Sequence, residues 1–491
     1  MNDPVWFYME IKTIFGEWYY MPCYKKKAIW SVICLILLFI LSSTCIAAIS
    51  NAKPIEVNST YIDNLQTRNT RAYYSFTVPS DGFIKIDFEH DNLTSGERGW
   101  DIALYNADSQ QLEYFYSRWN QPKVSSANIG LKQGQYYIKI YVNTSFGKHN
   151  NANYYLTVNY TESDYWEKEP NDTILTASQV DLNQPYKGSF RITSRNISDV
   201  DYYVFQLKED GYVNIIFEHE NLTDKKTGWR LMLLDEQSTE LDYFTSALNQ
   251  TKTNSTNVGL PKGIYYVKVY RQMLDEYSNA NYTLTVNYME SDYWEKEPND
   301  KILTATQVDL NQPYRGSTRI TSRNINDLDY YVFQLEEDSY IKMVFEHENL
   351  SENQIGWEIK LLDYDSETIE SFNSYMNQTL TNSDDVGLSA GNYYVLVKPK
   401  QRQNIVDYTL TIKTLNLART VEETTTEDLV QANDETHNLD NELDVVANEE
   451  PVEETNPGGF FEANIIPIIV VGAALAIIMA LVIMIIKPKN S

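Results

Sequence analysis

Short segments in which apolar and polar residues alternate run through the middle of the chain. The segments 212–217, 265–270 and 282–288 have this two-residue period and are rich in β-branched and aromatic side chains, which is typical of strands. Turn-forming residues separate such segments, as at 209–211 (Glu-Asp-Gly) and 261–263 (Pro-Lys-Gly). No helical period of useful length lies between them. The pattern therefore predicts an all-β chain built from antiparallel two-sheet sandwiches or jelly rolls.

An internal repeat fixes the number of these sandwiches. The ten residues 163–172 (SDYWEKEPND) return unchanged at 291–300, so a unit is repeated with a period of 128 residues. The motif FEHENL at 217–222 recurs at 345–350, and FEHDNL at 88–93 marks a diverged copy that lacks the Glu-Pro-Asn-Asp head. Each unit is long enough to bury its own core. We expect three tandem domains, namely repeat 1 (53–162), repeat 2 (163–290) and repeat 3 (291–415).

Charge and cysteine content narrow the chemistry. The formal net charge of -28 argues against nucleic acid as a partner. An acidic protein of this kind usually just stays soluble, although local carboxylate clusters could hold cations. All three cysteines, Cys23, Cys34 and Cys45, precede the repeats, which therefore offer neither disulfides nor thiol chemistry.

Both ends of the chain carry apolar runs. Three lysines at 25–27, an apolar stretch at 28–41 and small residues up to Ala52 predict a leader and secretory signal over residues 1–52. Cleavage after Ala47 or Ala52 is one possibility, and an uncleaved anchor is the other. The uncharged run 465–486 would span roughly 33 Å as a helix, which predicts a transmembrane helix at 464–486.

The flanks of this second run set the expected topology. Lys487 and Lys489 follow it, which places the tail 487–491 in the cytoplasm and the repeats outside the cell. Between the repeats and the helix, residues 420–456 contain thirteen Asp or Glu and no Lys or Arg. We therefore expect a disordered acidic stalk at 416–463.

Three motifs in repeats 2 and 3 resemble a known family. They are Glu-x-Glu-Pro-Asn-Asp at 167–172, Asp-x-Asp-Tyr-Tyr-x-Phe at 199–205 and Gly-x-Tyr-Tyr-Val at 263–267. Together they resemble the bacterial and archaeal pre-peptidase C-terminal domain, whose relatives include the collagen-binding domains of clostridial collagenases. The resemblance covers repeats 2 and 3 almost fully and repeat 1 only in its later part. It implies β-sandwiches of about this size, which usually accompany secreted proteases and bind substrate or assist secretion. No protease domain is recognisable in this chain.

The resemblance also implies a calcium site in each complete repeat. The residue types suit one, because a hard cation prefers six to eight oxygen ligands, and the motifs supply carboxylates and one amide without sulfur or imidazole. Solvated acidic turns are the alternative reading. Asp199 and Asp327 are weaker candidates, and repeat 1, with Arg71-Ala72-Tyr73 at the second motif, should bind no calcium. The implied ligands are Glu167, Glu169, Asn171, Asp172 and Asp201 in repeat 2, and Glu295, Glu297, Asn299, Asp300 and Asp329 in repeat 3.

Other candidate motifs favour structural roles. His90, His219 and His347 occupy one slot in three separate domains, so they cannot converge on a single metal and are expected to be structural residues at strand ends. The Gly-x-Ser-x-Gly match at 387–391 is expected to be a loop, since a nucleophile elbow needs a strand-to-helix turn. Most of the 38 tyrosines should be core or sheet-face residues. A minority, with Trp100, Trp229 and Trp357, could instead stack on sugars or grip a peptide.

These features favour a non-catalytic, membrane-anchored cell-surface protein whose tandem modules bind an extracellular polymer or protein, with calcium stabilising repeats 2 and 3. Two alternatives remain open. The modules could form a structural envelope spacer that binds nothing specific, or the chain could be an accessory subunit of a separate secreted or membrane protease.

Overall fold

The computed structural model describes residues 51–415, except for 68–69, 95–98, 143–151, 191, 195–196, 223–226, 272–279, 320–326 and 401–405. This part is built from strands and two single-turn 3₁₀ helices, so the predicted all-β class is confirmed. Within these residues no helix is long and apolar enough to cross a membrane. The expected stalk, the expected transmembrane helix and nearly all of the expected signal segment lie outside them.

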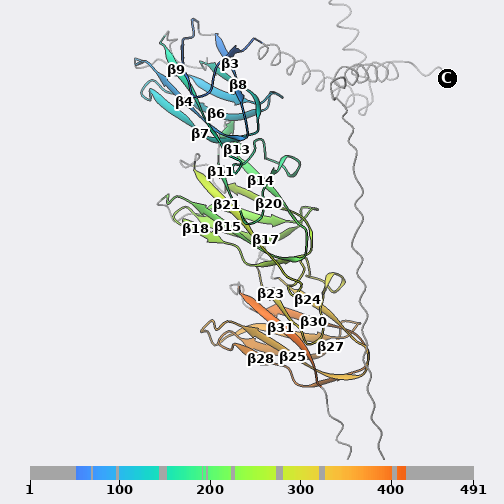
Figure 1. Ribbon diagram of the computed structural model, residues 1–491. Helices are drawn as coiled ribbons and strands as arrows, with labels where there is room; N and C mark the ends of the chain where they lie inside the picture. The colour runs from blue at the N-terminus through green and yellow to red at the C-terminus, as the bar shows by residue number, and fades with distance from the viewer. Residues whose placement is uncertain are drawn as a thin grey trace, which may run out of the picture. The chain divides into compact units, whose positions relative to one another are not determined.

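Repeat 1 is made of two sheets. A five-stranded sheet has the order β1-β3-β8-β5-β6, and a four-stranded sheet has the order β2-β9-β4-β7. Figure 1 marks β3, β8 and β6 of the first sheet and β9, β4 and β7 of the second. Its strands are β1 (Lys53–Pro54), β2 (Thr60–Asp63), β3 (Arg71–Val78), β4 (Gly82–His90), β5 (Asp101–Tyr105), β6 (Gln111–Tyr116), β7 (Lys123–Leu131), β8 (Gly134–Tyr141) and β9 (Tyr154–Glu162).

Repeat 2 has the same strand order, β10-β14-β20-β16-β17 in one sheet and β11-β21-β15-β18 in the other, with β19 also paired to β15. A small β12-β13 hairpin is added. The elements are η1 (Ile174–Thr176), β10 (Ser178–Gln179), β11 (Pro185–Ser189), β12 (Ile192–Ser194), β13 (Ile197–Ser198), β14 (Val200–Leu207), β15 (Gly211–His219), β16 (Thr227–Leu234), β17 (Glu240–Ala247), β18 (Lys252–Asn254), β19 (Val258–Leu260), β20 (Gly263–Arg271) and β21 (Asn281–Glu290).

Repeat 3 repeats this plan, with sheets β22-β24-β30-β26-β27 and β23-β31-β25-β28 and with β29 paired to β25. Its elements are η2 (Ile302–Thr304), β22 (Thr306–Gln307), β23 (Pro313–Ser317), β24 (Asp329–Leu335), β25 (Ser339–His347), β26 (Ile355–Leu362), β27 (Thr368–Tyr375), β28 (Leu380–Asn382), β29 (Val386–Leu388), β30 (Gly391–Pro399) and β31 (Asp407–Leu415).

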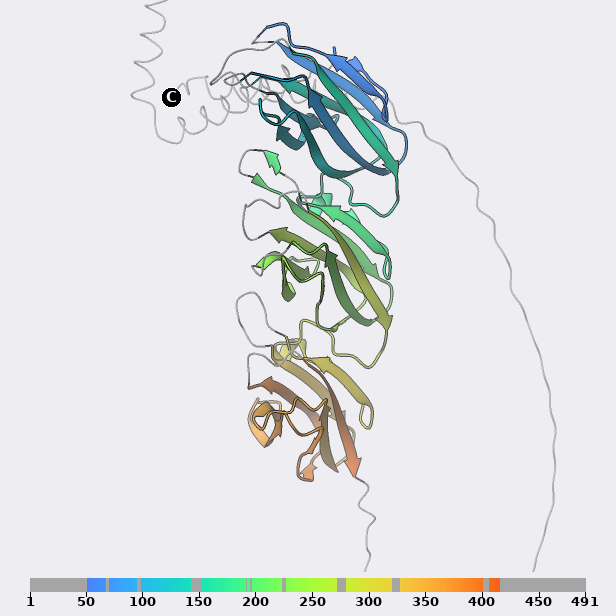
Figure 2. The same ribbon diagram turned by 90° about the vertical axis from the view of Figure 1, so that its left-hand side faces the viewer.

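Each repeat encloses its own apolar core between its two sheets. In β15 every second residue is buried, from Gly211 to His219, and the residues between them are only half-buried. Val213, Ile215 and Phe217 thus enter the core of repeat 2, opposite residues of the five-stranded sheet such as Phe205. Figure 2 shows the long strands of each repeat lying side by side in these layers. The alternation in the sequence is therefore the alternation between core and outer face.

Three tryptophans that could have formed a binding face belong to these cores instead. Trp100 is 1% exposed, and Trp229 and Trp357 are 0% exposed. The suggestion that they stack on a ligand is therefore wrong. The histidines lie where a structural role requires. His219 is the last residue of β15, packs 4.0 Å from the ring of Trp229, and its Nδ1 lies 2.7 Å from the carbonyl oxygen of Glu220.

The Gly-x-Ser-x-Gly match is confirmed as a connection between two strands. It begins within β29 and ends where β30 starts, and no helix follows it. A nucleophile elbow is therefore absent from this place.

Candidate functional site

The segment that opens each complete repeat, 163–172 in repeat 2 and 291–300 in repeat 3, is called here the head segment. In repeat 2 it runs beside β11, where Lys187 N–H donates to Tyr165 O over 2.8 Å and Glu167 N–H donates to Lys187 O over 2.9 Å. On its other side Glu169 N–H donates to Gly130 O of repeat 1 over 3.0 Å. The head segment thus hydrogen-bonds to its own repeat and to the one before it.

Side chains reinforce this junction between repeats 1 and 2. Trp166 stacks on Phe83 with ring centroids 4.4 Å apart, and Lys168 Nζ lies 3.3 Å from Asp81 Oδ2. Ser189 Oγ donates to the carbonyl oxygen of Asn128. Direct contacts therefore join the two repeats around the head segment.

The junction between repeats 2 and 3 has the same plan. Trp294 stacks on Tyr212 at 4.4 Å, Lys296 forms an ion pair with Asp210, and Ser317 Oγ donates to the carbonyl oxygen of Asn257. Because two different pairs of repeats use equivalent contacts, the junction is a recurrent feature of the chain.

The head segment of repeat 2 brings carboxylates together beneath this junction. Glu167, Glu169 and Asp201 each offer an oxygen, and these atoms lie within 4.8 Å of one another. Asp201 comes from β14 and is 0% exposed, as is Glu167, while Glu169 is 4% exposed. Asn171 is fully buried beside them, and its N–H donates to Glu169 Oε2 over 3.2 Å. We call these four residues the acidic cluster of repeat 2.

Repeat 3 holds two overlapping groups of carboxylates. Glu295, Glu297 and Asp329 form the first, which matches that of repeat 2, and Glu297, Asp300 and Asp327 form the second. In each group the offered oxygens lie within 4.8 Å of one another. Asp300 is exposed, but Asp327 is buried just before β24. These five residues and Asn299 form the acidic cluster of repeat 3.

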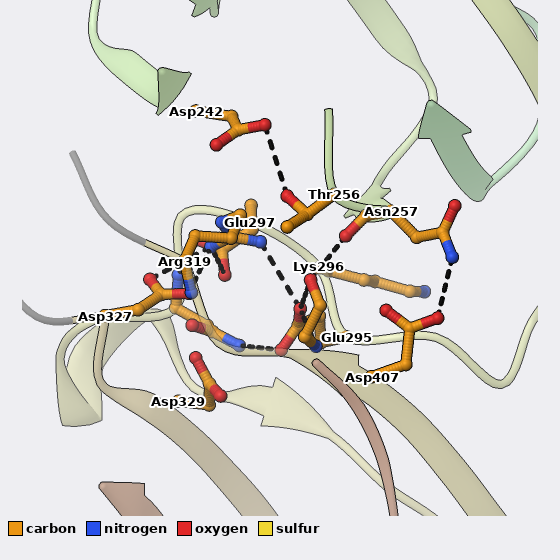
Figure 3. Close-up of polar contacts among 12 residues, drawn as sticks. Asp242, Thr256, Asn257, Glu295, Lys296, Glu297, Arg319, Asp327, Asp329 and Asp407 are labelled. Atoms are coloured by element: carbon orange, nitrogen blue, oxygen red, sulfur yellow. Dashed lines mark hydrogen bonds and ion pairs between the residues drawn. The ribbon is translucent and has the colours of Figure 1, made fainter. Parts of the chain in front are cut away.

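An arginine side chain lies inside this second cluster. Arg319, which is 3% exposed, places Nη1 3.3 Å from Glu295 Oε1 and Nη2 3.0 Å from Asp327 Oδ2. Nη2 also forms a close ion pair with Glu297 (Figure 3). A buried guanidinium is stable only when paired in this way, so Arg319 is part of the electrostatic balance of the cluster.

Some buried oxygens of the clusters have no hydrogen-bond partner within the described residues. They are Asn171 Oδ1 in repeat 2, and Asn299 Oδ1 and Asp329 Oδ1 in repeat 3. All three residues are 0% exposed. A buried acceptor without a partner is costly, and a bound cation would satisfy it. The donor set is oxygen only, which fits calcium in the first group of repeat 3.

The protonation of the cluster of repeat 3 reflects its crowding. Burial raises the pKa of Glu295 to about 8, although Arg319 opposes the shift, and Glu297 adds to it. Burial also raises the pKa of Asp327 and of Asp329 well above the usual range. Burial and crowding therefore favour the neutral forms of these carboxyl groups, and a bound cation would oppose that shift.

A pair of buried tyrosines supports each cluster. In repeat 2, Tyr203 and Tyr282 share a hydrogen bond of 2.6 Å, and Tyr282 donates to Asp201 Oδ2 over 2.5 Å. Tyr331 and Tyr408 do the same for Asp329 in repeat 3, at 2.7 Å and 2.5 Å. The tyrosines hold one carboxylate oxygen of each aspartate in place, and in repeat 3 the other oxygen, Asp329 Oδ1, has no hydrogen-bond partner within the described residues.

Repeat 1 keeps the tyrosine pair, but its described residues contain no group of carboxylates like those of repeats 2 and 3. Tyr74 and Tyr154 share a hydrogen bond of 2.6 Å, but Ala72 stands at the place of Asp201, two residues before the first tyrosine of the pair. Tyr74 donates instead to Asp63, over 2.9 Å. The tyrosine pair is therefore part of the fold, and the acidic cluster is an addition to it.

The structure separates the proposed ligands into two classes. In each complete repeat the two glutamates, the asparagine and the strand aspartate meet, whereas Asp172 is half-buried and belongs to no carboxylate group within the described residues. The two weaker candidates are also buried. Asp327 forms an ion pair with Arg319, and Asp199 is 1% exposed. Sequence reasoning missed Arg319. The available signal was the 128-residue period, which also places Arg191 at the equivalent position.

No family model matches the chain. Solved structures with a similar fold include the pre-peptidase C-terminal domain of a collagenase from Bacillus anthracis, at 25% identity over 22% of this chain and 94% of that one, with a TM-score of 0.18. An archaeal virus turret protein with a triple jelly roll is 9% identical over 72% of this chain and 88% of its own, with a TM-score of 0.21.

A third similar structure comes from Clostridium perfringens and contains an M60 catalytic domain with two CBM51 domains. It is 9% identical over 72% of this chain and 56% of its own, with a TM-score of 0.17. At these TM-scores the likenesses establish neither a family nor an activity for the chain.

Proposed function

We propose that this chain is a non-catalytic, membrane-anchored cell-surface protein. Its tandem modules bind an extracellular polymer or protein, and calcium stabilises repeats 2 and 3. The observation that carries the calcium role is the location of the acidic clusters, which are buried and lie where consecutive repeats touch. A substrate cannot reach carboxylates that are 0% to 4% exposed, such as Glu167, Glu169 and Asp201. A small ion held there would strengthen the junction instead.

The calcium ligands in repeat 3 would be Glu295, Glu297, Asn299 and Asp329, and those in repeat 2 their equivalents Glu167, Glu169, Asn171 and Asp201. When bound, the ion supplies positive charge among mutually repelling carboxylates and a partner for the free oxygens of Asn299 and Asp329. The chain's own residues do the positioning. Tyr408 orients Asp329, and Ser317 N–H donates to Glu295 Oε1 over 2.8 Å.

For the binding face we propose an exposed patch in repeat 1, at the end of β6. Tyr116 and Trp119 are each 45% exposed, so part of each ring is open to a ligand. The guanidinium of Arg118 lies 5.2 Å from the centre of the Tyr116 ring, and its Nη2 donates to the tyrosine hydroxyl over 2.8 Å. Aromatic faces beside a fixed guanidinium suit stacking on sugar rings or on a peptide.

A pull-down of the full-length protein with insoluble extracellular polymers, such as polysaccharides and collagen, tests this role. Trp119→Ala and Tyr116→Ala should each weaken retention at least several-fold. Tyr364→Ala is the matched control, because it removes a ring that is 77% exposed and lies in repeat 3, outside the proposed patch. If all variants are retained as well as the wild type, the patch is not the binding face. Failure of the wild type to bind any polymer or protein partner would favour the spacer alternative.

The location and the lack of catalysis are parts of the same proposal. Protease added to intact cells should digest the repeats and leave a small C-terminal fragment, whereas full protection of repeat 2 would contradict an outside location. The purified protein should hydrolyse no peptide, ester or glycoside. An activity that survives repurification and is lost on a single substitution would show an enzyme. Co-purification with a protease would favour the accessory-subunit alternative.

A further inference from the structure

The two carboxylate groups of repeat 3 are not equivalent, because Arg319 contacts them differently. Nη2 of Arg319 pairs with both Glu297 and Asp327, the two buried members of the second group (Figure 3). The backbone N–H of the same arginine donates to Asp327 Oδ2 over 3.1 Å. The guanidinium therefore lies between the oxygens that a metal ion in the second group would need.

A metal ion and this guanidinium exclude each other there. Both would draw on Glu297 Oε1 and Asp327 Oδ2, the oxygens that Arg319 Nη2 contacts, and both are positive, so close approach would be strongly repulsive in a buried place. Arg319 contacts Glu297 through Oε1, so Oε2 of the same carboxylate remains for an ion of the first group. The side chain of Arg319 is held by three carboxylates and is 3% exposed, which leaves it little freedom to move aside.

The first group differs in its free oxygens. Asp329 Oδ1 and Asn299 Oδ1 are buried and have no hydrogen-bond partner within the described residues. No ion pair joins Arg319 to Asp329 in this part of the chain, although Nη1 does reach Glu295. Four carboxylates are buried here, namely Glu295, Glu297, Asp327 and Asp329, and one guanidinium neutralises only one of their charges. The remaining negative charge can accommodate one divalent cation.

We propose that Arg319 is a built-in cation that takes the place of a metal ion between Glu297 and Asp327. Repeat 3 then binds one divalent cation, in its first group, and gains a second only when Arg319 is removed. The first ion rests on the calcium role proposed above, whereas the exclusion of the second rests on Arg319 alone. When calcium is withdrawn, Asp327 therefore still has the positive charge of Arg319 beside it.

Counting bound calcium in the full-length protein by equilibrium dialysis tests this inference. Arg319→Ser should bind one more calcium per chain than the wild type, since Glu297, Asp300 and Asp327 lie close enough to share an ion. Arg315→Ser is the control. It removes an exposed arginine from the nearby strand β23, and its calcium count should equal that of the wild type.

A second pair of variants tests the same site while Arg319 stays in the chain. Asp327→Asn should leave the number of bound calcium ions unchanged, because Asp327 pairs with the arginine and not with the metal. Asp329→Asn should lower it by one. This comparison also decides the matter if Arg319→Ser does not fold at any calcium concentration.

The outcomes separate this inference from the calcium role itself. No gain in Arg319→Ser relative to Arg315→Ser, or a loss of one ion in Asp327→Asn, would overturn it. If the wild type binds no calcium but Arg319→Ser binds one, the calcium role of repeat 3 fails while the role of Arg319 stands.

Discussion

Trp294 of repeat 3 lies against Tyr212 of repeat 2, with ring centroids 4.4 Å apart and an angle of 27° between the ring planes. Trp294 is 3% exposed. The buried surface of one repeat is thus completed by an aromatic ring of its neighbour, which links the stability of repeat 3 to contact with repeat 2.

Trp294→Ala should uncouple the two repeats. Truncating a buried aromatic residue costs roughly 3–5 kcal/mol, which includes the lost stacking on Tyr212. We expect the head segment 291–300 to become sensitive to proteases and a separate melting transition to appear in calorimetry. Tyr364→Ala, which removes an exposed ring of repeat 3, should change neither result. Unchanged proteolysis of Trp294→Ala would mean that the stacking contributes little to the junction.

Glycines at the junction allow a close approach that no other residue permits. A Cβ atom on Gly259 would lie 1.9 Å from the carbonyl oxygen of Glu295, and one on Gly130 would lie 1.9 Å from that of Glu167. Both distances are far below contact distance, and the opposing atom is backbone, so the head segment would have to move. The glycines are therefore needed for packing between repeats.

Gly259→Ala should destabilise the junction by about 1–3 kcal/mol, as overpacking of a buried contact does. The chain supplies its own control. Gly387 holds the equivalent place in repeat 3, and the nearest atoms that a Cβ atom there would meet, among the described residues, belong to the Tyr340 ring at 3.2 Å. Thermal denaturation should show a clear loss for Gly259→Ala and a much smaller one for Gly387→Ala. Equal losses would show that the glycine serves the strand itself and not the junction.

The sequence predicted the parts of the fold that depend on local pattern. Alternation in 212–217 became β15, with Val213, Ile215 and Phe217 in the core. The tryptophans were harder to place because a register shift precedes two of them, between Thr227 and Trp229 and between Ile355 and Trp357. A shift of this kind breaks the two-residue period, so counting along the strand could not assign their faces.

The candidate site was predictable only in its composition. The duplicated motifs pointed to Glu295, Glu297 and Asp329, which do meet. They did not reveal that Arg319 enters the cluster, because its pairing with Asp327 depends on how the chain returns after β23. Nor did they show the contact with the preceding repeat, since Phe83 and Tyr212 differ in identity and carry no shared motif.

A buried aspartate near the second junction predicts a pH dependence. Asp242, in β17, is 3% exposed and accepts a hydrogen bond from Thr256 Oγ1 over 3.2 Å (Figure 3). Burial raises its pKa to about 6, although Arg319 opposes the shift. The folded protein therefore holds this proton more tightly than the unfolded chain. The resulting stability is present below the unfolded pKa of about 4 and is lost as the pH rises through about 6.

Asp242 also accepts a hydrogen bond from Tyr243 N–H over 2.8 Å. Asp242→Asn removes the penalty of the buried charge, because the amide can keep hydrogen bonds with both Tyr243 N–H and Thr256 Oγ1. At pH 7.5 the variant should be more stable than the wild type, by at most about 3 kcal/mol, and near pH 4 the difference should vanish. Chemical denaturation at several pH values measures it. Glu236→Gln, which changes an exposed carboxylate in the preceding turn, should show no such trend. A gain for Asp242→Asn that is independent of pH would point to packing instead of ionisation.

The proposed calcium sites predict that the order of the junctions depends on the ion. Without it, carboxylates such as Glu167, Glu169 and Asp201 repel one another, and the head segment should loosen from both repeats that it touches. Extracellular modules bind calcium at roughly 10⁻⁴ to 10⁻³ M, and a site at ten times its dissociation constant gains about 1.4 kcal/mol. We therefore expect calcium to raise the melting temperature by a few degrees relative to chelator.

Paired substitutions assign this calcium response to the clusters. The double variant Asp201→Asn with Asp329→Asn should lose it, because each change removes a ligand charge while keeping the hydrogen bond from the adjacent tyrosine. Asp63→Asn in repeat 1 is the matched control, since Asp63 accepts the same kind of hydrogen bond from Tyr74 and belongs to no carboxylate group in the part of the chain that the structure describes. Calorimetry with calcium and with chelator measures all three proteins. If the double variant responds like the wild type, the clusters are not the calcium sites. If Asp63→Asn also loses the response, the effect arises from the tyrosine pairs of the fold and not from the head segments.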